Sequence, residues 1–176
     1  MVTPFGPTPA WIRAYIHAKR EGFEEREARL RASLSCGIKG KQFARCRLST
    51  GTITVPVEGG GDGLKKKTAN PILSEHGKWR REHIGAINAA YGRTPFYAHL
   101  IAEIDAVYAG SEGITLEDFN SRLTDVVFGW FDQSALTSTG DERIEKVRKE
   151  ISAKVNEDLS IFDALFRLGR EAVFAL

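Results

Sequence analysis

The sequence predicts an α+β protein of a single domain, with a small antiparallel sheet in the N-terminal half followed by a mainly helical C-terminal half. Three observations support this fold class. The 176 residues can bury one hydrophobic core but are few for two. Polar and apolar residues alternate in short segments before residue 58, as they do on strands. After residue 78, apolar residues recur every three or four positions, as they do on helices.

In the N-terminal half we expect one helix and three strands. A Thr-Pro pair at residues 8–9 makes a favourable helix start, and the apolar residues that follow at helical spacing end at Gly22. Residues 29–34 alternate in polarity and are predicted to form a strand. Residues 43–48 and 52–57 alternate in the same way, and the short turn between them predicts an antiparallel hairpin.

The sheet should end at Pro56, because proline cannot donate a hydrogen bond to a neighbouring strand. The glycine- and lysine-rich residues 58–70 are expected to form a flexible loop with almost nothing apolar to bury. This stretch is not a P-loop, because Gly63 is followed by Leu64 where that motif requires lysine. Residues 71–73 add a further short strand before the helices begin.

The C-terminal half is predicted to be helical to its end. A helix over residues 78–91 places Trp79, His83 and Ile87 on one apolar face and ends at Gly92. The remaining helices are expected to start at Thr94-Pro95, Thr115, Asp141 and Ser160. The last of them should end near Gly169, and an apolar tail at residues 173–176 should pack against the core.

Composition places the chain among soluble folded proteins, with 42% hydrophobic and 27% charged residues. No run approaches the roughly 20 apolar residues that cross a bilayer, so we expect no membrane span. Residues 1–9 show neither the basic start nor the apolar stretch of a signal peptide. Cys36 and Cys46 are therefore expected to be reduced thiols in a cytoplasmic protein.

Charge is divided unevenly along the chain. Residues 1–83 contain 16 Lys and Arg against 8 Asp and Glu, a net charge of +8, and the remainder contains 9 against 15, a net charge of −6. A basic half attracts anionic partners such as phosphates or nucleotides, but the two halves can equally pair with each other inside the fold.

Two arginines make the best candidate binding site. Arg45 and Arg47 alternate with Cys46 on a predicted strand, so both should project from the face opposite the core. Planar guanidinium groups grip two oxygens of a phosphate or carboxylate at once. Lys39 and the helix residues Arg80 and Arg81 are expected to extend this basic surface. The alternative is an ordinary solvated strand face.

Three other residues are candidates for chemistry. Cys46 and His83 form the one thiol and imidazole pair that the predicted fold brings together, and such a pair suits acyl transfer. Each has a structural alternative, Cys46 as a small core residue and His83 as a buried imidazole with satisfied hydrogen bonds. Asn120 lies inside an apolar helix stripe, where its amide must either tie down a loop or touch a ligand.

Other ligand classes have little support. The four histidines show no pairing one helical turn apart with each other or with a cysteine pair, so we predict no metal, and we expect no cofactor. The aromatic residues lack the basic strand platform of a protein that binds single-stranded nucleic acid, which makes nucleic acid an unexpected partner.

Several motifs together resemble one family of bacterial proteins, the WbqC-like proteins. They extend over most of the chain and comprise Arg45-Cys46, residues 54–57, residues 79–83 with Ala90-Tyr91 and Pro95-Phe96, residues 116–120, and residues 159–163 with Phe166, Gly169 and Glu171. The chain departs from the family pattern at Ala44, where the family usually has Asn, and at Arg170, where it usually has Pro.

The resemblance implies a role in O-antigen or other surface-polysaccharide biosynthesis. It suggests a transferase that moves a glycyl or other acyl group to a sugar or nucleotide-sugar precursor. Arg45, Arg47 and Arg80 would then hold the anionic substrate, and His83 would be the acid or base. The alternative is a non-catalytic protein that binds an anion or a carbohydrate and positions other biosynthetic enzymes. Neither alternative specifies an oligomeric state.

Overall fold

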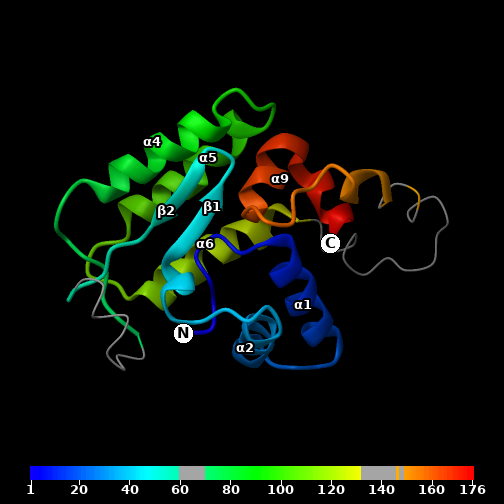
Figure 1. Ribbon diagram of the computed structural model, residues 1–176, viewed down its shortest axis with the longest axis horizontal. Helices are drawn as coiled ribbons and strands as arrows, with labels where there is room; N and C mark the ends of the chain where they lie inside the picture. Colours follow the sequence, from blue (N-terminus) through cyan, green and yellow to red (C-terminus); the bar gives the residue numbers. More distant parts are fainter. Residues whose placement is uncertain (60–69, 132–145, 147–148) are drawn as a thin grey trace.

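The computed structural model describes residues 1–59, 70–131, 146 and 149–176 (Figure 1). Most of these residues are helical, and the described strands form one two-stranded antiparallel sheet in the N-terminal half. The predicted fold class is therefore confirmed. In chain order the elements are α1 (Pro9–Arg20), α2 (Glu25–Ser35), the 3-10 helix η1 (Gly40–Ala44), β1 (Arg45–Leu48), β2 (Gly51–Thr54), α4 (Trp79–Tyr91), α5 (Tyr97–Ala109), α6 (Leu116–Trp130), α9 (Ile161–Leu168) and the 3-10 helix η2 (Gly169–Ala175).

Helix α1 begins as its sequence predicts. Thr8 has an extended backbone, and its side chain accepts a hydrogen bond from the Trp11 N–H, while Pro9 occupies the first helical position. The buried residues of α1 recur at helical spacing and join the core. The helix ends at Arg20, just before Gly22, which has a positive φ of 90°.

The predicted strand over residues 29–34 is wrong, because this segment belongs to helix α2. Six residues are too few to distinguish the two-residue period of a strand from the 3.6-residue period of a helix. The segment is part of a longer run of strong helix formers that begins at Glu25. The helix is reinforced by two ion pairs one turn apart, from Arg29 to Glu25 at 2.7 Å and from Arg31 to Glu27 at 3.0 Å.

The predicted hairpin is confirmed, although its strands are shorter than expected. Cys46 pairs with Ile53 and Arg47 with Thr52 in the antiparallel register. Cys46 is buried and Arg47 exposed, as the alternation requires. Regular pairing stops at Thr54, before Pro56. Of the expected short strand at residues 71–73, two isolated bridges are present, between Val57 and Leu73 and between Ile72 and Thr115.

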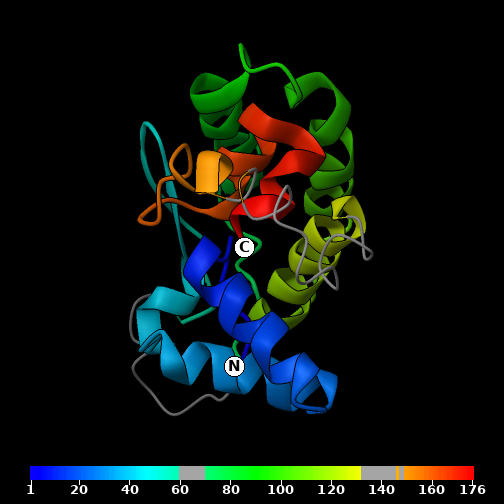
Figure 2. The ribbon, with the colours of Figure 1, turned by 90° about the vertical axis from the view of Figure 1, so that its right-hand side faces the viewer.

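Helices α4, α5, α6 and α9 carry most of the core. Helix α4 buries Trp79, His83, Ile87 and Tyr91, and it contacts α5 and α9. Helix α5 packs on α6, which begins after Thr115; the Thr115 side chain accepts a hydrogen bond from the Asp118 N–H. In Figures 1 and 2, α1 and α2 lie together at one end of the molecule, and α4 and α5 lie together at the other.

The chain end is partly as predicted. Ser160 caps α9 by accepting a hydrogen bond from the Phe162 N–H, and α9 ends at Leu168, just before Gly169, where η2 begins; η2 buries Val173. Most of the expected glycine- and lysine-rich loop and the start of the helix expected after Asp141 lie outside the described residues. Among the residues that the structure describes, no helix is both long and apolar enough to cross a membrane.

The N-terminal segment, residues 1–8, is built into the fold by main-chain hydrogen bonds. The Phe5 N–H donates to the Phe43 carbonyl at 3.1 Å, and the Ile161 N–H donates to the Pro7 carbonyl at 2.8 Å. The Ser160 N–H donates to the Arg47 carbonyl at 2.8 Å. The segment therefore lies beside β1 and the start of α9, both of which are distant from it in sequence.

Candidate functional site: a basic pocket beside the hairpin

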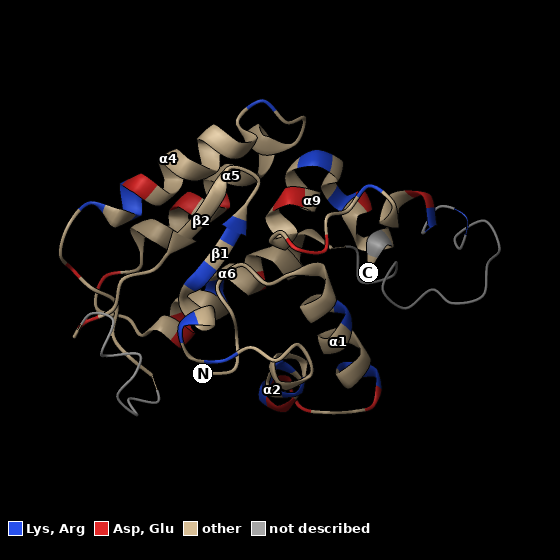
Figure 3. Cartoon of the chain, in the orientation of Figure 1, with Lys and Arg blue, Asp and Glu red and all other residues tan. Residues whose placement is uncertain are grey.

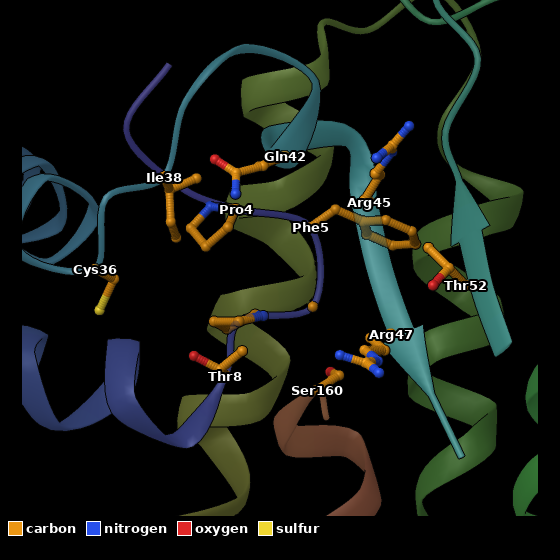
Figure 4. Close-up of a pocket in the computed structure, with 12 residues that line it drawn as sticks. Pro4, Phe5, Thr8, Cys36, Ile38, Gln42, Arg45, Arg47, Thr52 and Ser160 are labelled. Carbon is orange, nitrogen blue, oxygen red and sulfur yellow. The ribbon is translucent and has the colours of Figure 1, made fainter. Parts of the chain in front are cut away.

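A pocket of about 430 Å³ lies between the N-terminal segment and the hairpin (Figure 4). Pro4 to Thr8 form one wall, and the exposed face of the hairpin, with Arg45, Arg47 and Thr52, forms another. The remaining lining residues come from the connection between α2 and η1, from η1 itself and from the start of α9, namely Cys36, Ile38, Gln42 and Ser160. We call this cavity the basic pocket.

Gly6 allows the N-terminal segment to lie directly on β1. Its φ is +58°, a left-handed conformation that favours glycine. A Cβ atom at this position would clash with the Sγ atom of Cys46 and would lie 2.9 Å from the Oγ atom of Ser160. The two walls of the pocket therefore meet at a point that has room for glycine alone.

Arg45 and Arg47 supply the charge of the pocket. They stand two residues apart on β1, and their side chains are exposed on the face opposite buried Cys46. Within the described ranges neither arginine forms an ion pair, and no Asp or Glu lines the pocket. Figure 3 shows basic residues on β1 without an acidic residue on that strand. The pocket therefore offers cationic donors that are not neutralised by neighbouring carboxylates.

Two further features favour a negative charge in this place. The Gln42 side-chain carbonyl accepts a hydrogen bond from the Lys39 N–H at 2.7 Å, which leaves the amide NH₂ group as a donor for the pocket. Thr8 caps the N-terminus of α1, and the first turn of α1 contains no acidic residue. Thr8 also lines the pocket, so the positive end of that helix dipole lies at the pocket wall without an acidic residue in its first turn.

Arg80 does not reach the basic pocket. Its guanidinium donates to the Ser111 hydroxyl at 2.7 Å and to the Ser111 carbonyl at 3.0 Å, and it pairs with Glu75 at 3.1 Å. It also lies over the Trp79 ring. These contacts tie the start of α4 to the segment after α5. The expected single basic surface is therefore divided, because Arg80 is engaged elsewhere.

Arg81 and Lys39 are exposed, and neither is among the residues that line the pocket. Arg81 lies on α4 next to Arg80. Lys39 precedes η1 and contributes its main-chain N–H to the hydrogen bond that orients Gln42. Of the six residues predicted from the sequence to bind substrate, the structure thus brings Arg45 and Arg47 together at one cavity.

His83 is a buried imidazole in an aromatic cluster. It stacks on Phe5 with ring centroids 5.9 Å apart, and its Nδ1 atom lies 3.2 Å from the Tyr108 hydroxyl. Burial lowers the pKa of His83 to about 4, although a hydrogen bond with the Thr54 backbone acts in the opposite direction. The imidazole is therefore neutral near pH 7. His83 does not line the pocket either. It corresponds to the structural alternative, a buried imidazole within the core.

Cys46 is a core residue behind the arginine face. Its exposed fraction is 1%, and burial raises the pKa of its thiol to about 12, against the opposing effect of a hydrogen bond with Ser160. A protonated thiol without solvent access is a poor nucleophile. Cys46 and His83 both pack near the N-terminal segment, but neither presents its reactive atom to the cavity.

Asn120 holds both walls of the pocket in place. It is fully buried, and its Nδ2 atom donates to the Thr3 and Phe43 carbonyls, each at 2.9 Å. Thr3 lies in the N-terminal segment, and Phe43 lies just before β1. This is the loop-fixing alternative for Asn120, and it makes the residue a positioning residue rather than a ligand contact.

Sequence reasoning did not identify the N-terminal wall or Gln42. The run Pro4-Phe5-Gly6-Pro7 was a usable signal, because prolines and a glycine in succession favour an extended segment that is rigid apart from one left-handed residue. No local pattern distinguishes Gln42, whose role depends on a turn that the sequence pattern does not specify.

Together these features define a small, mainly helical α+β protein with a cationic cavity beside its hairpin. A model of the WbqC-like protein family matches residues 38–156, which is more than half of the chain, so the protein belongs to this family. No curated protein and no solved structure matches the chain. The matched region contains the hairpin wall with both arginines, whereas the N-terminal wall and α9 lie outside it.

Proposed function

We propose that this protein binds a small anionic molecule in the basic pocket, with Arg45 and Arg47 as the counter-charges. The observation that carries the proposal is the pair of arginines without ion-pair partners in the described ranges, facing a cavity without a carboxylate. In a protein with nearly equal numbers of acidic and basic residues, two adjacent arginines beside such a cavity favour an anion.

The dimensions of the cavity support a small-molecule ligand. Its volume of about 430 Å³ lies in the range of roughly 300–1,000 Å³ that is typical of small-molecule sites. The walls are fixed by main-chain hydrogen bonds of the N-terminal segment and by the paired hairpin, so binding requires little ordering.

The composition of the walls favours binding over catalysis. Among the described residues, no histidine, aspartate or glutamate lines the pocket, and these are the usual general acids and bases. We therefore place first the non-catalytic role of an anion- or carbohydrate-binding accessory protein. Family membership supports the second proposal, glycyl or acyl transfer to a sugar or nucleotide-sugar in O-antigen or other surface-polysaccharide biosynthesis.

The test compares arginine variants by calorimetry with inorganic phosphate as the probe. Arg45→Ala and Arg47→Ala should each weaken binding about tenfold, because a charge-assisted hydrogen bond to a partly exposed group contributes on the order of 1.5 kcal/mol. Arg93→Ala is the matched control, since Arg93 is exposed after α4 and does not line the pocket. It should bind phosphate as the wild type does.

Equal phosphate affinity in all four proteins would overturn the proposal. The transferase alternative has its own test. The protein is mixed with activated amino acids and nucleotide sugars, and products are sought by mass spectrometry. The absence of a product would contradict this alternative.

A further inference from the structure

The basic pocket has two chemically different ends. Figure 4 shows Arg45, Arg47 and Thr52 on one side of the cavity and Pro4, Ile38 and Cys36 on the other. Guanidinium and hydroxyl groups form the first side. A proline ring and an aliphatic side chain form much of the second side, with the Gln42 amide beside them (Figure 4). A ligand that fits both sides is anionic at one end and mainly apolar at the other.

The arginine end suits a phosphate better than a carboxylate. Residues two apart on a strand are separated by roughly 7 Å between Cα atoms, and their side chains project in the same direction. A carboxylate has two oxygens, which one guanidinium satisfies through a bidentate pair. A phosphate group has additional oxygens and a higher charge, so it can accept hydrogen bonds from both arginines at once.

The side of the cavity opposite the arginines is mainly apolar, and main-chain hydrogen bonds hold it in place. The Ile38 N–H donates to the Ser33 carbonyl at 2.9 Å, which anchors the turn that carries this half-buried side chain. Pro4 stands between Thr3, held by Asn120, and Phe5, held by the Phe43 carbonyl. A preformed surface of this kind gains free energy when an apolar group covers it, with little loss of conformational freedom.

We infer that the ligand is an organic phosphate, with its phosphate between Arg45 and Arg47 and a ring or other apolar group against Pro4 and Ile38. This inference rests on the proposed function of the pocket and specifies its substrate class. The Gln42 amide NH₂ group lines the same cavity and is available to a hydroxyl or carbonyl of the organic part.

Three simple probes separate the contribution of the phosphate group to affinity from that of the apolar group. Phenyl phosphate and methyl phosphate carry the same anion, but only phenyl phosphate carries a ring; benzoate carries the ring with a carboxylate. By calorimetry, phenyl phosphate should bind about tenfold more tightly than methyl phosphate, because covering part of one ring is worth on the order of 1.4 kcal/mol. It should also bind more tightly than benzoate. In Ile38→Ser the advantage of phenyl phosphate over methyl phosphate should shrink.

The outcomes distinguish this inference from the proposal on which it rests. Equal affinities for phenyl and methyl phosphate, both lost in Arg47→Ala, would overturn the organic-phosphate inference and leave the anion site in place. Benzoate binding as tightly as phenyl phosphate would overturn the assignment of phosphate. Failure of all three probes to depend on Arg45 or Arg47 would overturn both. The wild-type comparison of the three probes decides the question even if Ile38→Ser folds poorly.

Discussion

At the scale of single residues, identical side chains have opposite roles because of what surrounds them. Arg80 is bound by Ser111 and Glu75 and stabilises the fold, whereas Arg45 and Arg47 face a cavity without a carboxylate. Spacing along the chain placed all three on one expected surface. Glu75, which neutralises Arg80, is five positions away, but the Arg80 guanidinium is also held by Ser111, 31 positions away, and no local pattern encodes that contact.

His83 should make the stability of the protein depend on pH. Its pKa in the folded protein, about 4, is below its ordinary value of 6.5. The unfolded chain therefore takes up a proton below pH 6.5 that the folded protein excludes. The contribution of the neutral imidazole to the free energy of unfolding is fully present above pH 6.5 and is lost as the pH falls toward 4. This contribution is about 3 kcal/mol at most.

Urea unfolding at pH 7.5 and at pH 4.5 measures this effect. His83→Gln should be less stable than the wild type at pH 7.5, since it disturbs contacts with Tyr108 and Phe5. Because glutamine does not titrate, its loss of stability at pH 4.5 should be smaller than that of the wild type. An equal loss in both proteins would show that His83 is not the group responsible.

At the scale of elements, helix α2 is the clearest case in which the sequence pattern misled. Its docking depends on Arg29, which is 7% exposed and bonds to Glu25 within α2 and to Asp125 of α6 at 2.6 Å. Glu25 also accepts a hydrogen bond from the Tyr15 hydroxyl of α1 at 2.7 Å. Hydrophobic patterns identify the buried face of a helix by its apolar residues. Arg29 is charged, so the pattern alone could not show that it lies on the buried face of α2.

Arg29→Ala should therefore weaken the docking of α2 on its neighbours. We expect the free energy of unfolding to fall by about 2 kcal/mol; this is less than for a fully buried ion pair, because the carboxylates of Glu25 and Asp125 are half exposed. Arg31→Ala is the matched control on the same helix: Arg31 pairs with half-exposed Glu27 and lies over the Phe23 ring, so its loss should cost about 1 kcal/mol or less. Chemical denaturation measures both, and equal losses would contradict the docking role of Arg29.

Sequence patterns predicted most of the other elements and the arginine face that forms one wall of the basic pocket. Caps and breakers such as Thr8, Thr115 and Gly169 act within one helical turn, so their signals are local and correct. The alternation around Cys46 likewise placed Arg45 and Arg47 on an exposed face. The second wall of the pocket could not be predicted, because it depends on long-range main-chain bonds.

At the scale of the whole molecule, the basic pocket exists because a terminal segment is held against an internal hairpin. Glu117 of α6 accepts hydrogen bonds from the Val2 and Thr3 N–H groups, and Asn120 donates to the Thr3 carbonyl. The segment then passes over Cys46 at Gly6. Arg45 and Arg47 lie within the family match, whereas the N-terminal wall of the basic pocket lies outside it. Changes in this segment should therefore alter ligand choice without removing the charge.

Gly6→Ala tests this arrangement against a control that shares its backbone conformation. Gly6 and Gly22 both have positive φ, so alanine costs on the order of 1 kcal/mol at either position. At Gly22 nothing lies within 4 Å of the added Cβ, whereas at Gly6 it would clash with Cys46. Gly22→Ala should therefore lose about 1 kcal/mol of stability and keep its affinity for phenyl phosphate.

Gly6→Ala should lose more stability than the control and should bind phenyl phosphate more weakly, because the N-terminal wall must move away from β1. Adding Cys46→Ala to Gly6→Ala should restore part of both losses, since it removes the Sγ atom that the new methyl group meets. Denaturation and calorimetry on Gly6→Ala, Cys46→Ala and the double variant complete this double-mutant cycle. If Gly6→Ala bound phenyl phosphate as tightly as Gly22→Ala does, the N-terminal segment would not be a wall of the ligand site.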